Sequence, residues 1–491
     1  MSRITLLLLL LFTHPVISAE KPDILMIAVD DLRPMLGCYG DQNIKTPHID
    51  ALAARGMLFE NAYCQYAKCG TSRLSIMTGL RPDSIGVFSN NFRDVSAFRR
   101  KRPDLKSLGH WFKDNGYYTR SFGKIYHDEW DNPNDWSEPS SPGRPREMWE
   151  VVDETNPTGP TIIAERLKCP VMQSPDVPDS HLYAGRMTDE VVALIKNRKS
   201  EQPRFIAAGY RRPHLPFIAP QKYYDLYKPD ETWLPVNPSP PKGVFPIAWF
   251  NSDGYGKTAQ NVGLEMPNPP TRREAIAWNG YEMRSYLGVP YHGVIPTELQ
   301  LDLIHAYAAC ISYVDTQIGR LLSALESSGQ RNNTIVILWS DHGWHLGESS
   351  AWGKMTNYDI ATRVPLIISD PSTKPGKANS FAELVDIYPT LCQLAGIPAP
   401  DHLEGGDLSA VVRNEEAPGK LSARSQYSRY KDKFVGHTVK THQFRYVKWT
   451  DKSGKTVAEE YYDSVKDPHE THNGISELSE MELEKVRSAL Q

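Results

Sequence analysis

The sequence lacks the features that mark three large classes of protein. Beyond the N-terminal segment, no apolar stretch approaches the roughly 20 residues needed to span a bilayer. Lys and Arg number 55 against 59 Asp and Glu, so the positive excess typical of nucleic-acid binding is missing. Six cysteines among 491 residues do not make a disulfide scaffold. Repeats and low-complexity tracts are also absent. We therefore expect no nucleic-acid partner. The length could hold two or three domains, although large α/β enzymes often use this much chain in one main domain plus a smaller one.

Residues 1–19 have the pattern of a secretory signal peptide. Arg3 precedes a leucine run, and small residues follow it. The run is short for a membrane span, and a buried apolar helix is the alternative interpretation. Cleavage would remove Arg3 and make the net charge of −4 one unit more negative, so an anionic substrate would need a local cluster of cations. We expect a secreted or periplasmic protein without membrane association, or a lysosomal one if the source is an animal.

Four short apolar segments predict buried strands, namely 23–29, 117–122, 204–209 and 334–339. Nearly continuous aliphatic runs of this kind are typical of strands covered on both faces, as in a mainly parallel sheet. Polar residues follow each segment in turn: Asp30 and Asp31, Lys124 and His127, His214, and Asp341 and His342. Because ligands gather at the carboxyl ends of such strands, we expect these side chains to converge on one site.

Helical patterns lie between and after these strands. Residues 105–115 and 297–328 have helical spacing, and Gly329 is a plausible end for the longer one. A further strand at 365–369 and a helix at 383–396 complete the predicted large domain.

The remaining segments predict insertions and a second, smaller unit. Residues 128–170 and 211–296 are rich in proline and aromatic residues and are interpreted as ordered insertions over the sheet edge. After residues 397–407, short β-like runs such as 443–449 indicate an antiparallel sheet. The predicted organisation is a signal peptide (1–19), a large α/β domain (20–410) and a C-terminal α+β subdomain (411–491).

Two pairs of adjacent residues predict a metal site. Asp30-Asp31 and Asp341-His342 supply carboxylate oxygens and one imidazole, which suit a hard divalent cation such as calcium. Adjacent aspartates would also repel each other without a cation between them. Taken singly, the first pair could simply start a turn and the second could cap a helix.

The segment CGTSRLSIMTG, Cys69–Gly79, resembles the signature C-x-P-S-R-x-x-x-[LM]-T-G of the sulfatases. In that family the cysteine is oxidised to Cα-formylglycine, whose hydrate has two hydroxyls: one attacks sulfur and the other later expels sulfate. Cys69, Ser72, Arg73, Thr78 and Gly79 match, whereas Thr71 stands where the family usually has proline or alanine. The formylglycine-generating or maturase enzyme reads this segment while it is extended, so Thr71 bears on maturation.

The resemblance runs nearly end to end. Matching segments are 29–40, 46–64, 122–127, 211–217, 313–322, 340–348, 352–367, 386–391 and 462–473. The chain is similar to the type I sulfatases of the alkaline phosphatase superfamily, and within them to the iduronate-2-sulfatases and their bacterial relatives. This implies an alkaline phosphatase-like fold, a large mainly parallel sheet sandwiched by helices.

The resemblance also implies a role for each matched residue. Asp30, Asp31, Asp341 and His342, with an oxygen of residue 69, would bind one calcium ion per chain. Arg73 and Lys124 would stabilise the aldehyde hydrate, His127 would deprotonate its spare hydroxyl, His214 would protonate the leaving oxygen, and Lys354 would contact a sulfate oxygen. Fixed cations aimed at sulfuryl oxygens, and histidines that exchange protons near neutrality, are what this chemistry requires.

Several of these residues also have ordinary structural interpretations: a solvated loop for Lys124, a capping or core position for His127, a loop fastener for His214 and aromatic stacking for Lys354. We expect His345 to pack beside the site. Trp249 and Trp278 could stack on sugar rings, but isolated tryptophans more commonly belong to the core.

The sequence therefore predicts a calcium-dependent sulfuric ester hydrolase acting on a sulfated oligo- or polysaccharide such as a glycosaminoglycan. One alternative is a phosphoesterase or phosphonate hydrolase of the same superfamily, although a two-zinc phosphatase would need more histidine and aspartate ligands. The other alternative is a non-catalytic protein that binds sulfated glycans, in which the Cys69 thiol is never oxidised.

Overall fold

The computed structural model describes residues 21–127, 130–140, 169–252, 263–266, 270–430 and 432–490. The predicted signal peptide and most of the predicted insertion at 128–170 lie outside these ranges. Among the described residues, no helix combines the length and apolar character needed to cross a membrane. All six cysteines lie in the described ranges, and none of them forms a disulfide.

A seven-stranded sheet forms the centre of the large domain, in the order β11-β2-β10-β7-β1-β5-β3. Its strands are β1 (Asp23–Val29), β2 (Met57–Tyr63), β3 (Tyr118–Gly123), β5 (Arg204–Tyr210), β7 (Thr334–Ser340), β10 (Leu366–Ser369) and β11 (Gly376–Glu383). Strand β10 runs antiparallel to both of its neighbours, and every other pairing is parallel. The mainly parallel sheet is confirmed; β2 and β11 were not predicted.

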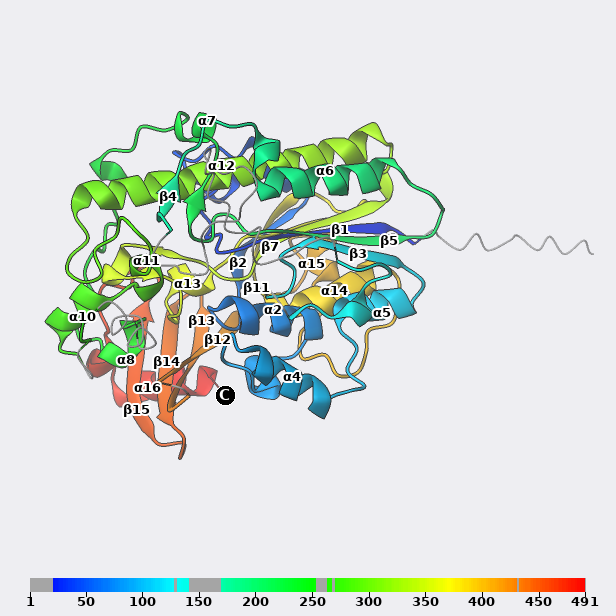
Figure 1. Ribbon diagram of the computed structural model, residues 1–491. Helices are drawn as coiled ribbons and strands as arrows, with labels where there is room; N and C mark the ends of the chain where they lie inside the picture. The colour runs from blue at the N-terminus through cyan, green and yellow to red at the C-terminus, as the bar shows by residue number, and fades with distance from the viewer. Residues whose placement is uncertain are drawn as a thin grey trace, which may run out of the picture.

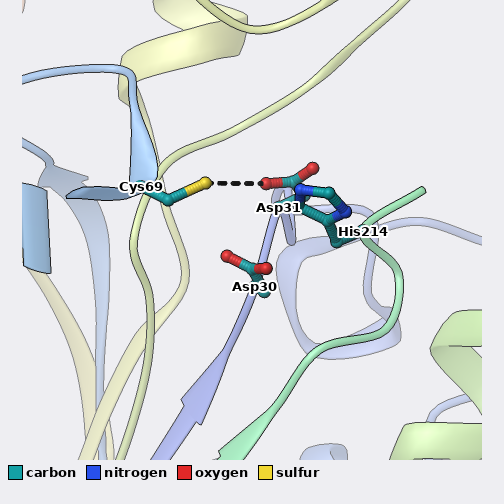
Figure 2. Close-up of side chains that lie close together, drawn as sticks. All are labelled: Asp30, Asp31, Cys69 and His214. Carbon is teal, nitrogen blue, oxygen red and sulfur yellow. Dashed lines mark hydrogen bonds between the residues drawn. The ribbon is translucent and has the colours of Figure 1, made fainter. Parts of the chain in front are cut away.

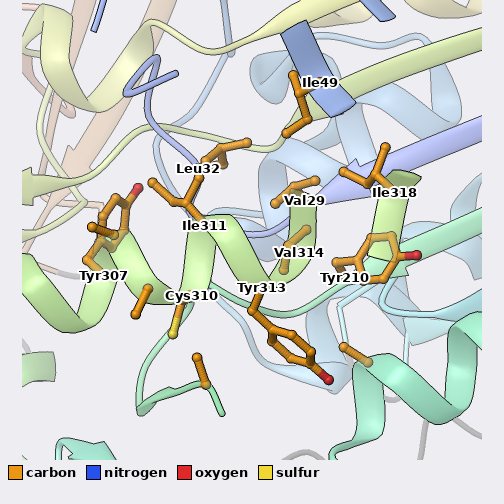
Figure 3. Close-up of a cluster of buried hydrophobic side chains, with 14 of the residues drawn as sticks. Val29, Leu32, Ile49, Tyr210, Tyr307, Cys310, Ile311, Tyr313, Val314 and Ile318 are labelled. Atoms are coloured by element: carbon orange, nitrogen blue, oxygen red, sulfur yellow. The ribbon is translucent and has the colours of Figure 1, made fainter. Parts of the chain in front are cut away.

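Helices cover both faces of this sheet (Figure 1). One face packs against α1 (Pro47–Ala53), α6 (Tyr183–Lys196) and α12 (Thr297–Ser327), and the other packs against α2 (Cys69–Thr78), α5 (Leu108–Asp114) and α14 (Ile387–Leu394). Successive residues of β1 alternate between the two cores, as the two-residue period of a strand requires. Figure 3 shows Ile311, Val314 and Ile318 of α12 beside Val29 at the end of β1.

The predicted helices are present with small changes at their ends. The long helix predicted at 297–328 is α12, and the helix predicted at 383–396 is a 3-10 turn, Leu384–Asp386, followed by α14. The helix predicted from residue 105 begins only at Leu108, because Ser107 takes an extended backbone conformation at the N-cap.

The four predicted strands end level with one another. Val29 of β1 pairs with both Tyr210 of β5 and Ser340 of β7, and Gly123 at the end of β3 pairs with Gly209. Gly123 has a φ of 68°, and a Cβ atom there would lie 2.2 Å from the Gly209 carbonyl oxygen. Only glycine fits this close approach, which turns the next residue, Lys124, towards the edge where the strands end.

The C-terminal part contains the predicted antiparallel sheet. Its strands are β12 (Ser422–Arg429), β13 (Phe434–Thr441), β14 (Phe444–Asp451) and β15 (Thr456–Asp463), and α16 (Glu480–Ala489) covers one face. The domain boundary at residues 410 and 411 stays a prediction.

The insertion at 211–296 forms short elements, with described helices α7 (Gln221–Tyr224), α8 (Pro246–Trp249), α10 (Arg272–Trp278) and α11 (Tyr281–Arg284). Trp249 and Trp278 are buried in one apolar cluster there, so the interpretation as core residues is confirmed.

A partly buried ion cluster joins the two sheets where β11 ends, with Glu383 and Asp386 buried and the cations Arg81 and Lys420 partly exposed. Arg81 donates two hydrogen bonds to Glu383, of 2.8 and 2.7 Å, and the Lys420 ammonium lies 2.6 Å from both Glu383 and Asp386. Burial disfavours the charged form of Glu383, but Arg81 and Lys420 lower the pKa of this carboxyl from 4.5 to about 2. Burial raises the pKa of Asp386. The cluster therefore depends on its two cations.

We expect Lys420→Met to lower the free energy of unfolding by about 2 kcal/mol, between the values for exposed and fully buried ion pairs. Urea unfolding at pH 7 measures this change. Since Glu383 is held ionised, the stabilisation is fully present above pH 4.5 and is lost as pH falls towards 2. Lys455→Met, in the exposed β14–β15 turn, is the control and should change stability by less than about 0.5 kcal/mol. Equal effects of the two substitutions would contradict the role of the cluster.

Candidate active site

Three fully buried aspartates meet at the carboxyl ends of β1 and β7. Asp30 and Asp31 directly follow β1, and Asp341 follows β7. The Asp30 amide donates to the Tyr210 carbonyl at 2.9 Å, which continues the pairing with β5, and the Asp31 amide donates to Asp341 Oδ1 at 3.1 Å. Asp31 has a φ of 61°, a left-handed conformation that aspartate tolerates better than most residues. The turn places these carboxylates together.

Three cations from three different elements balance these carboxylates. Arg73 of α2 donates from Nε to Asp341 at 2.8 Å and from Nη2 to Asp30 at 3.1 Å. The Lys124 ammonium, from the turn after β3, forms an ion pair with Asp30. Lys354, directly after β9 (Trp352–Gly353), places Nζ 2.8 and 3.0 Å from the two oxygens of Asp31. All three cations are buried.

Cys69 lies between these groups at the N-terminus of α2. Its Sγ is 3.2 Å from His342 Nε2 and 3.3 Å from Lys354 Nζ. It also lies 3.8 Å from Asp31 Oδ1, the contact that Figure 2 marks with a dashed line. The free amides at a helix N-terminus favour negative charge on a group placed there. A reactive group at position 69 would therefore face cations and helix amides together.

Burial and neighbouring charges shift the pKa values of the two adjacent aspartates in opposite directions. Burial disfavours ionised Asp30, but Lys124 and Arg73 hold the pKa of Asp30 well below its usual range. Burial raises the pKa of Asp31 well above its usual range. Lys354 compensates only in part, and the negative charge of Asp30 adds to the rise. The ionised form of Asp31 would thus be stabilised by one more cation nearby.

The unmodified Cys69 thiol is a poor nucleophile in this setting. Burial raises its pKa to about 11, and Lys124 and Lys354 offset only part of that effect. The thiol is therefore protonated at neutral pH, and the thiolate is the form that attacks.

His214 lies beside the aspartates after β5 (Figure 2). Its Nδ1 lies 2.6 Å from the Leu215 carbonyl oxygen, so Nδ1 is the protonated nitrogen that donates and Nε2 faces the site. Burial lowers the pKa of His214 well below its usual range, and Lys354 adds to this shift. Without substrate, the ring is neutral at pH 7.

The other residues predicted from the sequence lie around this cluster. His127 is half-buried on the turn after Lys124, with its ring 5.4 Å from the Trp130 ring. His345 is buried and hydrogen-bonded to Thr356 at 2.8 Å, which is a packing position. Thr71 is buried in the first turn of α2 and donates to the Val87 carbonyl at 2.8 Å. The unusual threonine thus holds the neighbouring loop against the helix.

The donor atoms fit a hard divalent cation. Two groups of four, with all their donor atoms within 4.8 Å of one another, share Asp30 and Cys69: one adds Asp31 and His214, and the other adds Asp341 and His342. Carboxylate oxygens, which calcium prefers, make up half of the donor atoms in each group. An oxygen in place of the Cys69 sulfur would improve this fit.

One buried site residue was missed by the sequence reasoning. Glu282 of α11 lies 3.5 Å from His214 Nε2 and 3.5 Å from Lys354 Nζ. Glu282 belongs to the aromatic-rich insertion at 211–296 and does not follow a predicted strand in the sequence. No motif or periodic spacing indicated it.

Comparison with known proteins places this geometry in context. The family model described as "Sulfatase" matches residues 22–397, and one described as "N-sulphoglucosamine sulphohydrolase, C-terminal" matches residues 347–491. The iduronate 2-sulfatase of Homo sapiens is 32% identical, covering 88% of this chain and 86% of the relative. A sulfatase of Formosa agariphila is 31% identical, covering 92% of this chain and 83% of the relative.

Solved structures share the fold. The phosphonate monoester hydrolase of Agrobacterium radiobacter aligns with a TM-score of 0.70 at 21% identity over 96% of each chain. A protein solved with its substrate D-glucosamine-2-N,6-O-disulfate aligns with a TM-score of 0.66 at 22% identity, over 96% of this chain and 98% of that one. At these identities the likeness establishes the alkaline phosphatase-like architecture.

Removal of divalent cations should lower the melting temperature, because the buried carboxylates would lose a shared counter-charge. Calcium at 100 times its dissociation constant would stabilise the protein by about 2.7 kcal/mol relative to the chelated form. Differential scanning calorimetry before and after chelation measures this, and titration calorimetry should give one calcium per chain. Asp341→Asn should weaken that binding. An unchanged melting temperature, with no heat of calcium binding, would contradict the assignment of the metal site.

Proposed function

The chain belongs to the sulfatase family, and we propose that it removes sulfate from a sulfated sugar or polysaccharide, using a formylglycine made from Cys69 and one calcium ion. The observation that supports this most directly is the position of residue 69. It lies at a helix N-terminus among three buried cations and three buried carboxylates. A protonated thiol gives little reactivity there, whereas a hydrated aldehyde would supply oxygen both to the metal and to sulfur.

Calcium, held by Asp30, Asp31, Asp341, His342 and an oxygen of residue 69, would act as a Lewis acid on sulfate oxygen. Arg73 and Lys124 would stabilise negative charge on the hydroxyls of the residue 69 hydrate, since both cations reach Asp30 beside it. Lys354, 3.3 Å from Sγ of residue 69, would contact an oxygen of the sulfate group. Arg73, Lys124 and Lys354 are each paired with a buried aspartate in the protein alone.

The two histidines would move protons in separate steps. His214 would donate a proton from Nε2 to the leaving oxygen. Its ring is neutral in the protein alone, so the negative charge of a bound sulfate ester would be needed to favour the protonated form. His127, at the half-buried end of the turn after β3, would take a proton from the second hydroxyl of the hydrate and so release sulfate.

The sugar substrate is inferred from what relatives are named for. The human relative is named for iduronate, and one structural neighbour was solved with a disulfated glucosamine. We propose a secreted or periplasmic enzyme that acts on sulfated saccharides, of which glycosaminoglycan fragments are the first to test. Sulfate release from a panel of sulfated oligosaccharides tests the function. Hydrolysis of phosphonate monoesters alone would contradict this function and favour a phosphonate hydrolase. Glycan binding without turnover would favour a non-catalytic glycan-binding protein.

We expect the peptide containing Cys69 to have the mass of formylglycine in active protein, and Cys69→Ala to abolish turnover while most metal ligands remain. Mass spectrometry and sulfate-release assays on the same samples measure this. Full activity with an unmodified thiol would refute the mechanism.

Thr71→Pro should raise the fraction of converted Cys69, and specific activity in proportion, if Thr71 slows recognition by the modifying enzyme. Thr71 lies in the first turn of α2, where proline is tolerated, so the cost to stability should be near the lost hydrogen bond to Val87, about 1 kcal/mol. The same peptide mass spectrum gives the converted fraction. Complete conversion of the natural sequence would show that Thr71 is no obstacle.

His214→Ala should slow sulfate esters with poor leaving groups far more than activated aryl sulfates, by about 100-fold or more, because only the former need a proton on the departing oxygen. Measurement of kcat/KM on a sugar sulfate and on 4-nitrophenyl sulfate gives this ratio. His127→Ala should instead slow sulfate release on both substrates. Equal losses on both substrates for His214→Ala would remove it from the acid role.

A further inference from the structure

Glu282 places one buried carboxylate between two groups of the proposed reaction. Its side chain is 6% exposed, with Oε1 3.5 Å from His214 Nε2 and Oε2 3.5 Å from Lys354 Nζ. These distances exceed those of direct N–H to O hydrogen bonds. The contact with Lys354 is an attraction between opposite charges, and the contact with His214 becomes one when Nε2 is protonated for transfer to the leaving oxygen. The Glu282 carboxylate thus faces both His214, which would protonate the leaving oxygen, and Lys354, which would contact the sulfate group.

The backbone around Glu282 is firmly held. Arg284, also in α11, donates from Nε to the Asn279 carbonyl at 2.7 Å and from its Nη atoms to the carbonyls of Pro290 and Gly293 at 2.9 and 2.8 Å. Arg284 is itself buried, so these three bonds fix the short helix to the surrounding loops.

One side chain ties this helix to Lys354. Asn251 accepts the Gly280 amide on Oδ1 at 2.8 Å and donates from Nδ2 to the Lys354 carbonyl at 3.0 Å. The start of α11 and the backbone of Lys354 are therefore held at a fixed separation, which keeps Glu282 within reach of the Lys354 ammonium.

Glu282 adds a further contact at the polar end of each of its two partners. His214 is held on its Nδ1 side by the Leu215 carbonyl at 2.6 Å, and Glu282 lies on its Nε2 side. The Lys354 ammonium lies between Asp31 and Glu282, at 2.8 and 3.5 Å. If Asp31 bound a cation, Glu282 would be the carboxylate that remains to hold this ammonium.

We propose that Glu282 is a positioning residue that holds His214 and Lys354 in the orientation used on the leaving oxygen and the sulfate group, an inference that rests on the proposed function. A glutamine in its place would accept from one partner with its single oxygen and present an amide to the other. It would keep the shape of the site and lose its ability to serve both cations.

The test is Glu282→Gln in the full chain, with Cys69 conversion checked by mass spectrometry. On a sulfated sugar, kcat/KM should fall by about 30-fold or more, as expected when a catalytic group is displaced by about 1 Å. On 4-nitrophenyl sulfate the loss should stay within about fivefold, because that leaving group needs no proton and only the effect on Lys354 remains. Adding Glu282→Gln to His214→Ala should slow the sugar substrate by at most about fivefold beyond His214→Ala alone, because only the effect through Lys354 remains once His214 is gone.

Glu470→Gln is the matched control, since Glu470 is also buried and ion-paired, with Arg445. It should lower stability without changing the ratio of the two kcat/KM values. Glu282→Asp keeps the charge with a shorter reach, so its kcat/KM on the sulfated sugar should lie between the values for wild type and Glu282→Gln. If Glu282→Gln does not fold, the ratio of kcat/KM on the two substrates is measured on Glu282→Asp instead.

Equal losses on the two substrates, or additive losses in the double variant, would overturn the positioning role. An active wild type and an unchanged Glu282→Gln variant would also overturn it and leave the sulfatase function intact. A wild type with converted Cys69 that releases sulfate from neither substrate would instead overturn the proposed function.

Discussion

The centre of this protein depends on one balance of charge: three aspartates with no exposure to water, held by Arg73, Lys124 and Lys354. Burying a carboxylate is costly unless a cation and hydrogen bonds compensate. Here each cation comes from a different element, so the balance exists only when α2, the turn after β3 and the segment after β9 are all in place. Folding and assembly of the site are therefore the same event.

The sheet makes that assembly possible. Strands β7, β1, β5 and β3 lie side by side and end level, so residues more than 300 positions apart in the chain, such as Asp30 and Asp341, come into contact. Each strand contributes a single turn to the site, and Gly123 allows one of those turns to pass close to the next strand. The two apolar cores keep these strands in register and take no part in the chemistry.

These features explain what could be predicted. Strands β1, β5 and β7 were found because burial on both faces leaves a clear apolar run, whereas the edge strand β3 has a mixed pattern. The residues after the strands followed from sheet topology. Strand β11 was missed because it is partly exposed and includes polar residues such as Lys377 and Asn379. Glu282 was missed because its contacts depend on the fold of an insertion that has no periodic pattern. The role of Thr71 in holding the Val87 loop is likewise a tertiary contact.

The position of Glu282 also bears on the overall charge of the site. With each group in its ordinary ionised form, the carboxylates of Asp30, Asp31, Asp341 and Glu282 exceed Arg73, Lys124 and Lys354 by one charge. A divalent cation would turn that single negative charge into a single positive one. Without Glu282 the loaded site would have one more positive charge facing the sulfate group. An excess of that kind would favour retention of the doubly charged sulfate product over its release. A carboxylate beside Lys354 is therefore consistent with turnover as well as with orientation.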